Sequence, residues 1–167
     1  MSTLYRTHSC GQVTETAIDQ IVTLSGWVNR RRDHGGIIFI DLRDRTGLIQ
    51  LVFDPSVCSE EIMAQAHKLR AEFVIKAEGK VIARDAAMVN PKLATGKIEI
   101  DVTTLTILNS AKPLPFQLDE AENVDEELRL QYRYLDLRRE KMHNFMKLRH
   151  EVVFAMREAL NLSLIHI

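Results

Sequence analysis

Three side chains have the chemistry to bind an unpaired nucleobase. Phe39 shares one face of an alternating segment with Asp41 and Arg43, and an exposed aromatic ring there can stack on a base. Gln50 can donate to and accept from a base edge, and Glu99 can accept from the amino group of cytosine. A glutamine or glutamate alone is commonly a surface residue. The same pattern also fits a Phe39 that packs beneath a loop or against a helix.

Positive charge lies close to these residues in the sequence. Arginines occupy positions 30–32, at the end of the segment before Phe39. Such a triplet is often a solvated strand end, but beside an exposed aromatic ring it favours contact with phosphates or bases. His34 precedes two glycines, and we expect this loop to be flexible enough to close over a bound base.

The sequence contains no recognisable motif of a nucleotide-binding loop, a hydrolase or a zinc site. We therefore assign no catalytic residue and no metal ligand. Cys10 and Cys58 are far apart and lack the spacing of metal ligands, so we expect two free, unreactive thiols.

Charge and hydropathy narrow the class of protein. The formal net charge is −1, which excludes a polycation that coats nucleic acid, so any nucleic-acid contact must be local. No apolar run reaches the roughly 18 residues of a membrane span, and residues 1–10 lack a secretory leader's apolar stretch. We expect a cytoplasmic protein.

An alternation with a period of two runs through residues 21–53 and predicts a meander of three strands. Turns are expected at residues 33–36 and 44–47, where glycine and aspartate gather. Ile38 and Ile40 share the inner face of the second strand, so Phe39 faces outward. Gln50 projects from the same outer face on the neighbouring strand.

The next elements complete a barrel. Ser59 begins a predicted helix of about three turns, with acidic residues in its first turn. Strands are expected at residues 73–83, where Gly79 marks a bend, and at residues 98–107. Three strands, a helix and two strands is the order of the OB-fold, a mainly β, five-stranded Greek-key barrel that commonly binds oligonucleotides. An SH3-like barrel has a similar strand count.

The remaining third of the chain is not part of this barrel. Residues 119–127 contain six carboxylates and are typical of a solvated connector. Residues 142–160 form a predicted helix whose apolar side chains recur at spacings of three and four. One barrel cannot bury that stripe, so we expect it to pack on another domain or subunit. The predicted organisation is a barrel domain at 1–109, a hinge at 110–139 and the start of a further domain at 140–167.

Three stretches carry a resemblance to a known family: GWVNRRRD at residues 26–33, FIDLRDR at 39–45 and YRYLDLRR at 132–139. Together they resemble the N-terminal region of bacterial aspartyl-tRNA synthetases, which are class II ligases. The resemblance implies that the barrel binds the tRNA anticodon. It implies that Phe39 stacks on the central uracil and that the other base contacts come from Arg32, Gln50 and Glu99. It also implies that Arg84 and Asn90 contact the anticodon stem-loop.

The same resemblance implies properties of a complete enzyme. Such an enzyme attaches aspartate to tRNA(Asp), binds ATP and Mg²⁺ and is a homodimer, but no residue of this chain is assigned to those sites. His34 lies in a specificity loop, and histidine there favours members that also charge tRNA(Asn). Residues 162–167 depart from the family pattern and no proline follows Pro115, so we expect a truncated reading frame at this end.

Two other classes of function remain open from the sequence. A free-standing single-strand-binding OB protein would account for Phe39 and the arginines, but it leaves the hinge-like stretch and the long helix without a role. A structural protein-binding barrel would instead bury Phe39 in a partner. Binding to an anticodon stem-loop distinguishes the three.

Overall fold

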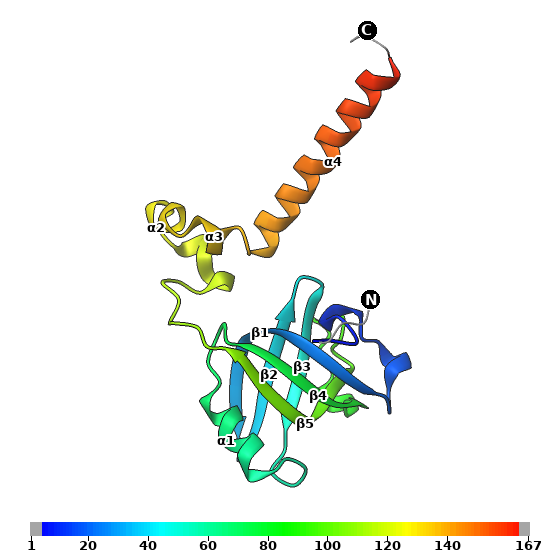
Figure 1. Cartoon of the computed structure of the whole chain (residues 1–167), viewed down its shortest axis with the longest axis vertical. Coiled ribbons are helices and arrows are strands. Elements are labelled where there is room, and N and C mark those ends of the chain that lie inside the picture. The colour runs from blue at the N-terminus through cyan, green and yellow to red at the C-terminus, as the bar shows by residue number, and fades with distance from the viewer. Residues whose placement is uncertain (1–4, 164–167) are drawn as a thin grey trace. The chain divides into compact units, whose positions relative to one another are not determined.

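A computed structural model of the chain describes residues 5–163, apart from the side chains of residues 119–121. The chain forms two compact units that divide between Pro113 and Leu114. The first unit is a β-barrel and the second is helical (Figure 1). The predicted truncation lies mostly in residues 164–167, outside the described residues.

The first unit is a closed barrel with the strand order β1-β2-β3-β5-β4. Its strands are β1 (Ile21–His34), β2 (Ile37–Asp44), β3 (Gly47–Phe53), β4 (Val74–Ala83) and β5 (Ile98–Asn109). All neighbours pair antiparallel except β3 and β5, which are parallel. Helix α1 (Glu60–Lys68) joins β3 to β4. This arrangement confirms the predicted five-stranded OB-fold.

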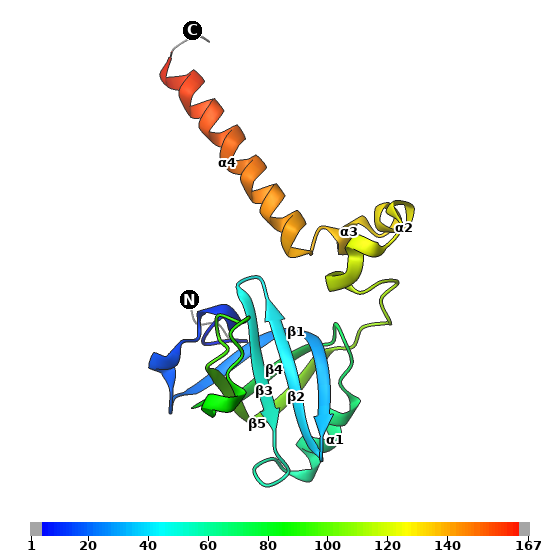
Figure 2. The ribbon, with the colours of Figure 1, turned by 180° about the vertical axis from the view of Figure 1, so that it is seen from behind.

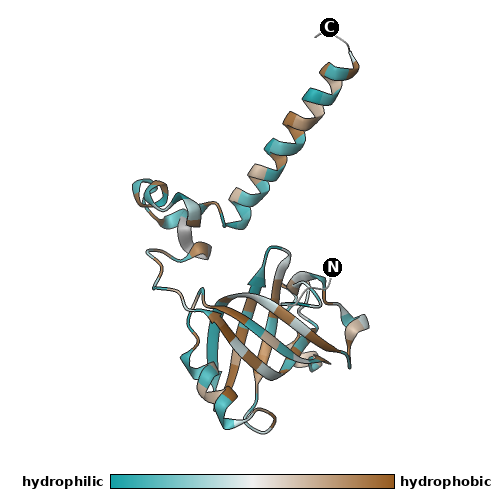
Figure 3. Cartoon of the chain, in the orientation of Figure 1, coloured by the Kyte–Doolittle hydropathy of each residue, from teal (hydrophilic) through white to brown (hydrophobic). Residues whose placement is uncertain are grey.

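The barrel core comes from every second residue of each strand. Figure 3 shows the resulting alternation of apolar and polar residues along the strands. The largest fully buried side chains of the strands are Leu24, Ile38, Ile40, Leu42, Ile49, Leu51, Phe53, Ile75, Ile98 and Ile100. Each such side chain contributes about 1.5–3 kcal/mol through removal of apolar surface from water. The core therefore holds the outer face of the strands in a defined register.

Local signals predicted two features of the barrel correctly. The Ser59 hydroxyl accepts a hydrogen bond from the Ile62 amide, as expected of the residue that caps α1. The register between β4 and β5 shifts between Glu78 and Gly79. A Cβ atom on Gly79 would lie 2.2 Å from the Asp101 carbonyl oxygen, so the close approach of the two strands requires glycine.

The segment before β1 packs against the turn between β2 and β3. It contains two short 3-10 helices, η1 (Cys10–Gln12) and η2 (Glu15–Ala17). The Cys10 amide donates to the Asp44 carboxylate at 2.8 Å, and the Gly11 amide donates to the Thr46 hydroxyl at 2.8 Å. These bonds tie the N-terminal segment to the barrel.

The second unit contains η4 (Leu118–Asn123), α2 (Glu126–Gln131), α3 (Arg133–Asp136) and α4 (Glu140–Leu162). Its small core is formed by Phe116, Leu118 and Leu135. The acidic stretch predicted as a connector is largely helical, because Asp125 caps α2 and acidic residues favour a helix N-terminus. Helix α4 is longer than predicted at both ends, and its apolar side chains, including Phe145 and Leu148, are exposed. None of the helices within residues 5–163 has the length and hydrophobicity needed to cross a membrane.

Candidate nucleic-acid interface

A β-bulge in β1 determines which arginines reach the outer face of the barrel. The register with β2 shifts between Val28 and Arg30, so β1 gains one residue there. Strict alternation from the buried Val28 would turn Arg32 toward the core. After the bulge, Arg32 instead pairs with Phe39 and shares its outer face. Figure 2 brings this side of the barrel, with β2 and β3, to the front.

The same bulge separates Arg31 from this face. Arg31 pairs with the buried Ile40, and its side chain reaches toward α1. There its Nη2 lies 3.2 Å from the Asp33 carboxylate and 3.3 Å from Nδ1 of His67. The three consecutive arginines therefore do not form one patch.

Phe39 is partly exposed and contacts His34. The two ring centroids are 6.0 Å apart at an interplanar angle of 62°, an edge-to-face contact. The predicted loop at residues 33–36 is wrong in extent, because β1 continues through His34 and only Gly35 and Gly36 form the turn. Both glycines have positive φ, 64° and 93°, which allows a tight two-residue turn. His34 is thus the last residue of a strand, beside Phe39.

A chain of hydrogen bonds runs across the outer face beside Phe39. Nη2 of Arg32 donates to the Asp41 carboxylate at 2.5 Å and to Oε1 of Gln50 at 3.1 Å. Nε2 of Gln50 donates to the Glu99 carboxylate at 3.0 Å. Nε of Arg84 lies 3.4 Å from the same carboxylate. We refer to Arg32, Asp41, Gln50, Glu99 and Arg84 as the polar network.

Gln50 differs from its prediction in exposure. It lies on the predicted face, but only 8% of its surface is exposed, because Arg32 and Glu99 occupy both ends of its amide. Its oxygen and nitrogen are already paired in the unbound protein. A base that contacts Gln50 must therefore meet an amide whose orientation is fixed by its neighbours.

The charges of the polar network cancel. Two guanidinium groups, of Arg32 and Arg84, face two carboxylates, of Asp41 and Glu99. Burial raises the pKa of Glu99, and the nearby Arg84 guanidinium and the Gln50 amide only partly oppose this shift. Burial likewise lowers the pKa of Arg84. The polar network thus offers oriented hydrogen-bonding groups whose charges balance.

Arg84 and Asn90, both predicted to contact RNA, lie in different settings. The Arg84 side chain is only 4% exposed, and its Nε also donates to the Ile98 carbonyl oxygen at 3.1 Å. Within the described part of the chain its buried Nη2 has no hydrogen-bond partner. Asn90 lies in the loop between β4 and β5, after η3 (Ala86–Met88), where its carboxamide oxygen accepts from the Lys92 amide. The structure brings Arg84 into the polar network and leaves Asn90 outside its hydrogen bonds.

Asp41 belongs to the polar network although the sequence did not single it out. Its position two residues after Phe39 places it on the same outer face. The alternation of the sequence predicts this face for Asp41, but the partner of its carboxylate depends on the bulge in β1.

Among residues 5–163 no cluster of three His, Cys, Asp or Glu side chains could hold a metal ion.

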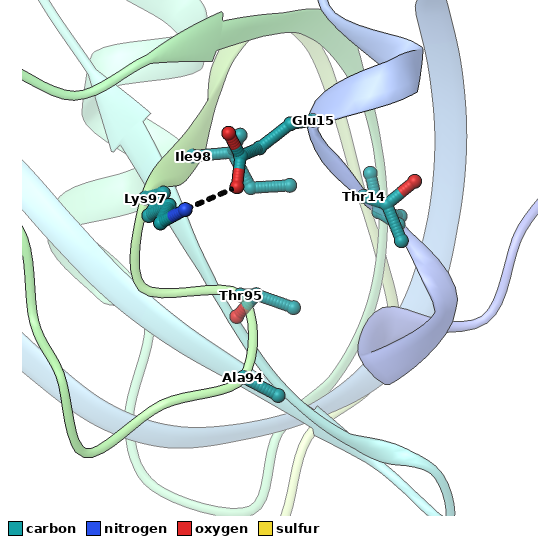
Figure 4. A pocket seen from close by; sticks show the side chains of 7 residues that line it. Thr14, Glu15, Ala94, Thr95, Lys97 and Ile98 are labelled. Atoms are coloured by element: carbon teal, nitrogen blue, oxygen red, sulfur yellow. Dashed lines mark ion pairs between the residues drawn. The ribbon is translucent and has the colours of Figure 1, made fainter.

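A small cavity of about 120 Å³ lies elsewhere on the barrel, between η2 and the loop before β5. The carboxylate of Glu15 and the amine of Lys97 form an ion pair of 2.8 Å beside it (Figure 4). Thr14, Ala94, Thr95 and Ile98 are among its other lining residues. No lining residue belongs to the polar network, so the cavity is separate from the candidate interface.

Comparisons with known proteins place this chain among tRNA ligases and nucleic-acid-binding domains. An aspartate–tRNA(Asp/Asn) ligase of Magnetococcus marinus is 55% identical over 156 residues, which cover 93% of this chain and 25% of the relative. A ligase of the same name from Bacillus subtilis is 54% identical over 157 residues, covering 93% of this chain and 26% of the relative. The chain spans about a quarter of the length of these curated relatives.

A solved structure and two family models cover both units. The asparaginyl-tRNA synthetase of Pyrococcus horikoshii, in complex with asparaginyl-adenylate, matches with a TM-score of 0.80 at 30% identity, over 93% of this chain and 34% of that one. A family model of class II tRNA synthetases (D, K and N) matches residues 125–163. The model of the OB-fold nucleic acid binding domain matches residues 22–108. Since that match includes more than half of the 167 residues, the chain belongs to the family of OB-fold nucleic acid binding domains.

Proposed function

We propose that this chain reads the anticodon of tRNA(Asp) as part of an aspartate–tRNA ligase. The observation that carries the proposal is the outer face of the barrel, where a partly exposed Phe39 lies beside an ordered, charge-balanced set of hydrogen-bonding groups. Stacking on an aromatic ring binds any base, whereas oriented donors and acceptors distinguish one base from another. The names of the relatives supply the amino acid and the RNA.

Each residue then has a role toward the RNA. Phe39 stacks on the central uracil of the anticodon. The base edges are contacted by Arg32, Gln50 and Glu99, whose hydrogen-bonding atoms lie on the same face. Arg84 and the loop of Asn90 face the anticodon stem-loop in this proposal. Because the Arg84 side chain is almost fully buried, its main role in this proposal is to hold the Glu99 carboxylate in place.

The proposal extends to the complete enzyme. A ligase of the relatives' length would bind ATP, Mg²⁺ and aspartate outside the barrel and would act as a cytoplasmic homodimer. In this arrangement the barrel occupies residues 1–109, a hinge follows at 110–139 and the catalytic domain begins at 140–167. The exposed apolar side chains of α4 would pack against the rest of that enzyme. The polar network supplies tRNA selection and takes no part in the activation of aspartate.

The range of tRNA substrates is a finer part of the proposal. His34 contacts Phe39 at the edge of the candidate interface, where it can influence the anticodon bases. We infer that the enzyme charges both tRNA(Asp) and tRNA(Asn). Aminoacylation kinetics of the full-length enzyme test this, and a catalytic efficiency with tRNA(Asn) below about 1% of that with tRNA(Asp), a loss of the size that one unfavourable contact can cause, would contradict it.

The central test is selective RNA binding by the 167-residue chain. An anticodon stem-loop that carries GUC should bind more tightly than loops in which these three bases are scrambled, by about 1–3 kcal/mol for each lost base contact. Fluorescence anisotropy with labelled stem-loops measures both affinities. Equal binding to all loops would support an unselective single-strand binder, and no binding to any loop would support a protein-binding barrel.

A further inference from the structure

The contact between Arg32 and Asp41 is the shortest link of the polar network. Nη2 of Arg32 lies 2.5 Å from the Asp41 carboxylate and donates to Gln50 with the same nitrogen. The Asp41 side chain is 18% exposed and that of Arg32 is 37% exposed, so the pair lies at the surface of the candidate interface. In the sheet, Asp41 stands opposite Arg30 on β1 and opposite Gln50 on β3.

We propose that Asp41 is a positioning residue that makes this face selective for bases. Its carboxylate holds the Arg32 guanidinium against Gln50 and cancels its charge, so that Arg32 meets a base edge instead of a backbone phosphate. This inference rests on the proposed reading of an anticodon by the same face.

The reason lies in the chemistry of arginine. An unpaired guanidinium binds phosphate strongly and in two-pronged geometry, and every nucleotide of any sequence carries a phosphate. Phosphate contacts add affinity without sequence information, whereas base contacts specify. A guanidinium that already pairs with a neighbouring carboxylate binds a phosphate with a smaller net free energy, because the new contact must replace an existing ion pair.

The charge balance supports the same conclusion. The polar network contains two positive and two negative groups, and its sum is zero. Loss of the Asp41 charge leaves the network with a net charge of +1 and leaves the Arg32 guanidinium without its ion-pair partner. Such a face should bind all single strands more tightly and discriminate less between them.

The test compares Asp41→Asn with a matched control, Asp19→Asn. Asp19 lies in the turn before β1, is 76% exposed at its side chain and pairs with Lys80 at 2.7 Å, away from the polar network. Its φ of 71° suits asparagine as well as aspartate. Both variants change the net charge of the chain by the same amount. Affinities for the GUC stem-loop and for a scrambled stem-loop are measured over a series of salt concentrations.

We expect Asp41→Asn to lower the ratio of the two affinities by about tenfold, the effect of one lost oriented contact. We also expect its binding of the scrambled loop to become steeper in salt, by about 0.7 in the slope of log K against log salt, which corresponds to one added phosphate contact. Asp19→Asn should leave the ratio and the slope at their original values.

Each outcome bears on one of the two claims. If the original chain prefers GUC and Asp41→Asn keeps both its ratio and its slope, the role of Asp41 is overturned and the proposed function stands. If the original chain has no preference, the proposed function itself fails. If thermal unfolding shows that Asp41→Asn does not fold, the same affinities are measured with Asp41→Glu instead. That variant keeps the charge but moves the carboxylate, so an unchanged slope with a reduced ratio supports the proposal, and an unchanged ratio overturns it.

Discussion

Arg32 lies directly opposite Phe39 across the ladder between β1 and β2. Side chains at opposite positions of an antiparallel pair have Cβ atoms about 4.5–5.5 Å apart, close enough to act on one bound group. A base that stacks on Phe39 would therefore lie within reach of the Arg32 guanidinium. This pairing joins the stacking surface to the polar network and is the basis of the first prediction.

Substitution of the ring should weaken RNA binding. We expect Phe39→Ala to reduce the affinity for the GUC stem-loop by about 1–3 kcal/mol, because the stacking partner of a base is lost. Phe39→Tyr keeps the ring and should bind nearly as well as the original chain. Fluorescence anisotropy measures the difference. An affinity of Phe39→Ala equal to that of Phe39→Tyr would show that no base stacks here.

The raised pKa of Glu99 predicts a pH dependence of stability. Burial raises this pKa above its usual value of 4.5, so between the two values the folded chain binds more protons than the unfolded chain. The contribution of Glu99 to the free energy of unfolding is therefore full below pH 4.5 and is lost as the pH rises through the shifted pKa. Glu99→Gln removes this titration. Urea unfolding over this range should show the original chain losing stability relative to Glu99→Gln as the pH rises, and a difference that stays constant would contradict the shift.

The close approach of β4 and β5 predicts a strong effect at Gly79. A Cβ atom there would meet the Asp101 carbonyl oxygen at 2.2 Å, and backbone cannot move aside as a flexible side chain can. We expect Gly79→Ala to lower the free energy of unfolding by about 1–3 kcal/mol or more, as overpacking does. Lys80→Ala, at the next and exposed position, should cost less than about 1 kcal/mol, because it removes only a surface ion pair. Chemical denaturation compares the two variants.

A buried carboxylate stabilises the start of α4. The Asp136 side chain is only 1% exposed and accepts from Nη1 of Arg133 at 2.8 Å and from Nε of the buried Arg139 at 2.7 Å. Asp136→Asn removes the charge that both guanidinium groups share. We expect the free energy of unfolding of the second unit to fall by about 3–5 kcal/mol, because the buried Arg139 guanidinium is left without its charged partner.

The loss of stability in the second unit is measured by hydrogen exchange, as reduced protection of the amides of α3. Glu122→Gln is the matched control, because its ion pair with Lys141 is exposed and should contribute about 0–1 kcal/mol. Equal protection in the two variants would contradict a stabilising role of Asp136.

Both native thiols should be unreactive in the folded chain. Burial raises the pKa of Cys10, helped by the neighbouring Asp44 carboxylate, and burial also raises the pKa of Cys58. A raised pKa lowers the fraction of reactive thiolate, even at about pH 8, close to the ordinary thiol value. Ellman's reagent should label neither residue until denaturant is added. A cysteine introduced by Ser110→Cys, at an exposed position, should react at once and serves as the positive control.

Several parts of this protein followed from the sequence by itself. The period of two in residues 21–53, the Ser59 cap and the spacing of the last two strands predicted the five-stranded barrel and the order of its elements along the chain. Phe39 and Gln50 were placed on one outer face because each lies between inward-facing apolar residues of its own strand. These features depend on local alternation and capping, which the identity of neighbouring residues determines.

The partners of these residues were decided only by the tertiary structure. The bulge between Val28 and Arg30 reverses the parity of β1, so the sequence could not tell that Arg32 faces outward while Arg31 turns toward α1. The polar network likewise joins residues far apart in the chain, with Gln50 and Glu99 brought together across the parallel pairing of β3 and β5. A bulge and a long-range ladder both arise because all strands of the closed barrel must satisfy their hydrogen bonds and twist together. This requirement involves the whole barrel, so it cannot be inferred from a short stretch of residues.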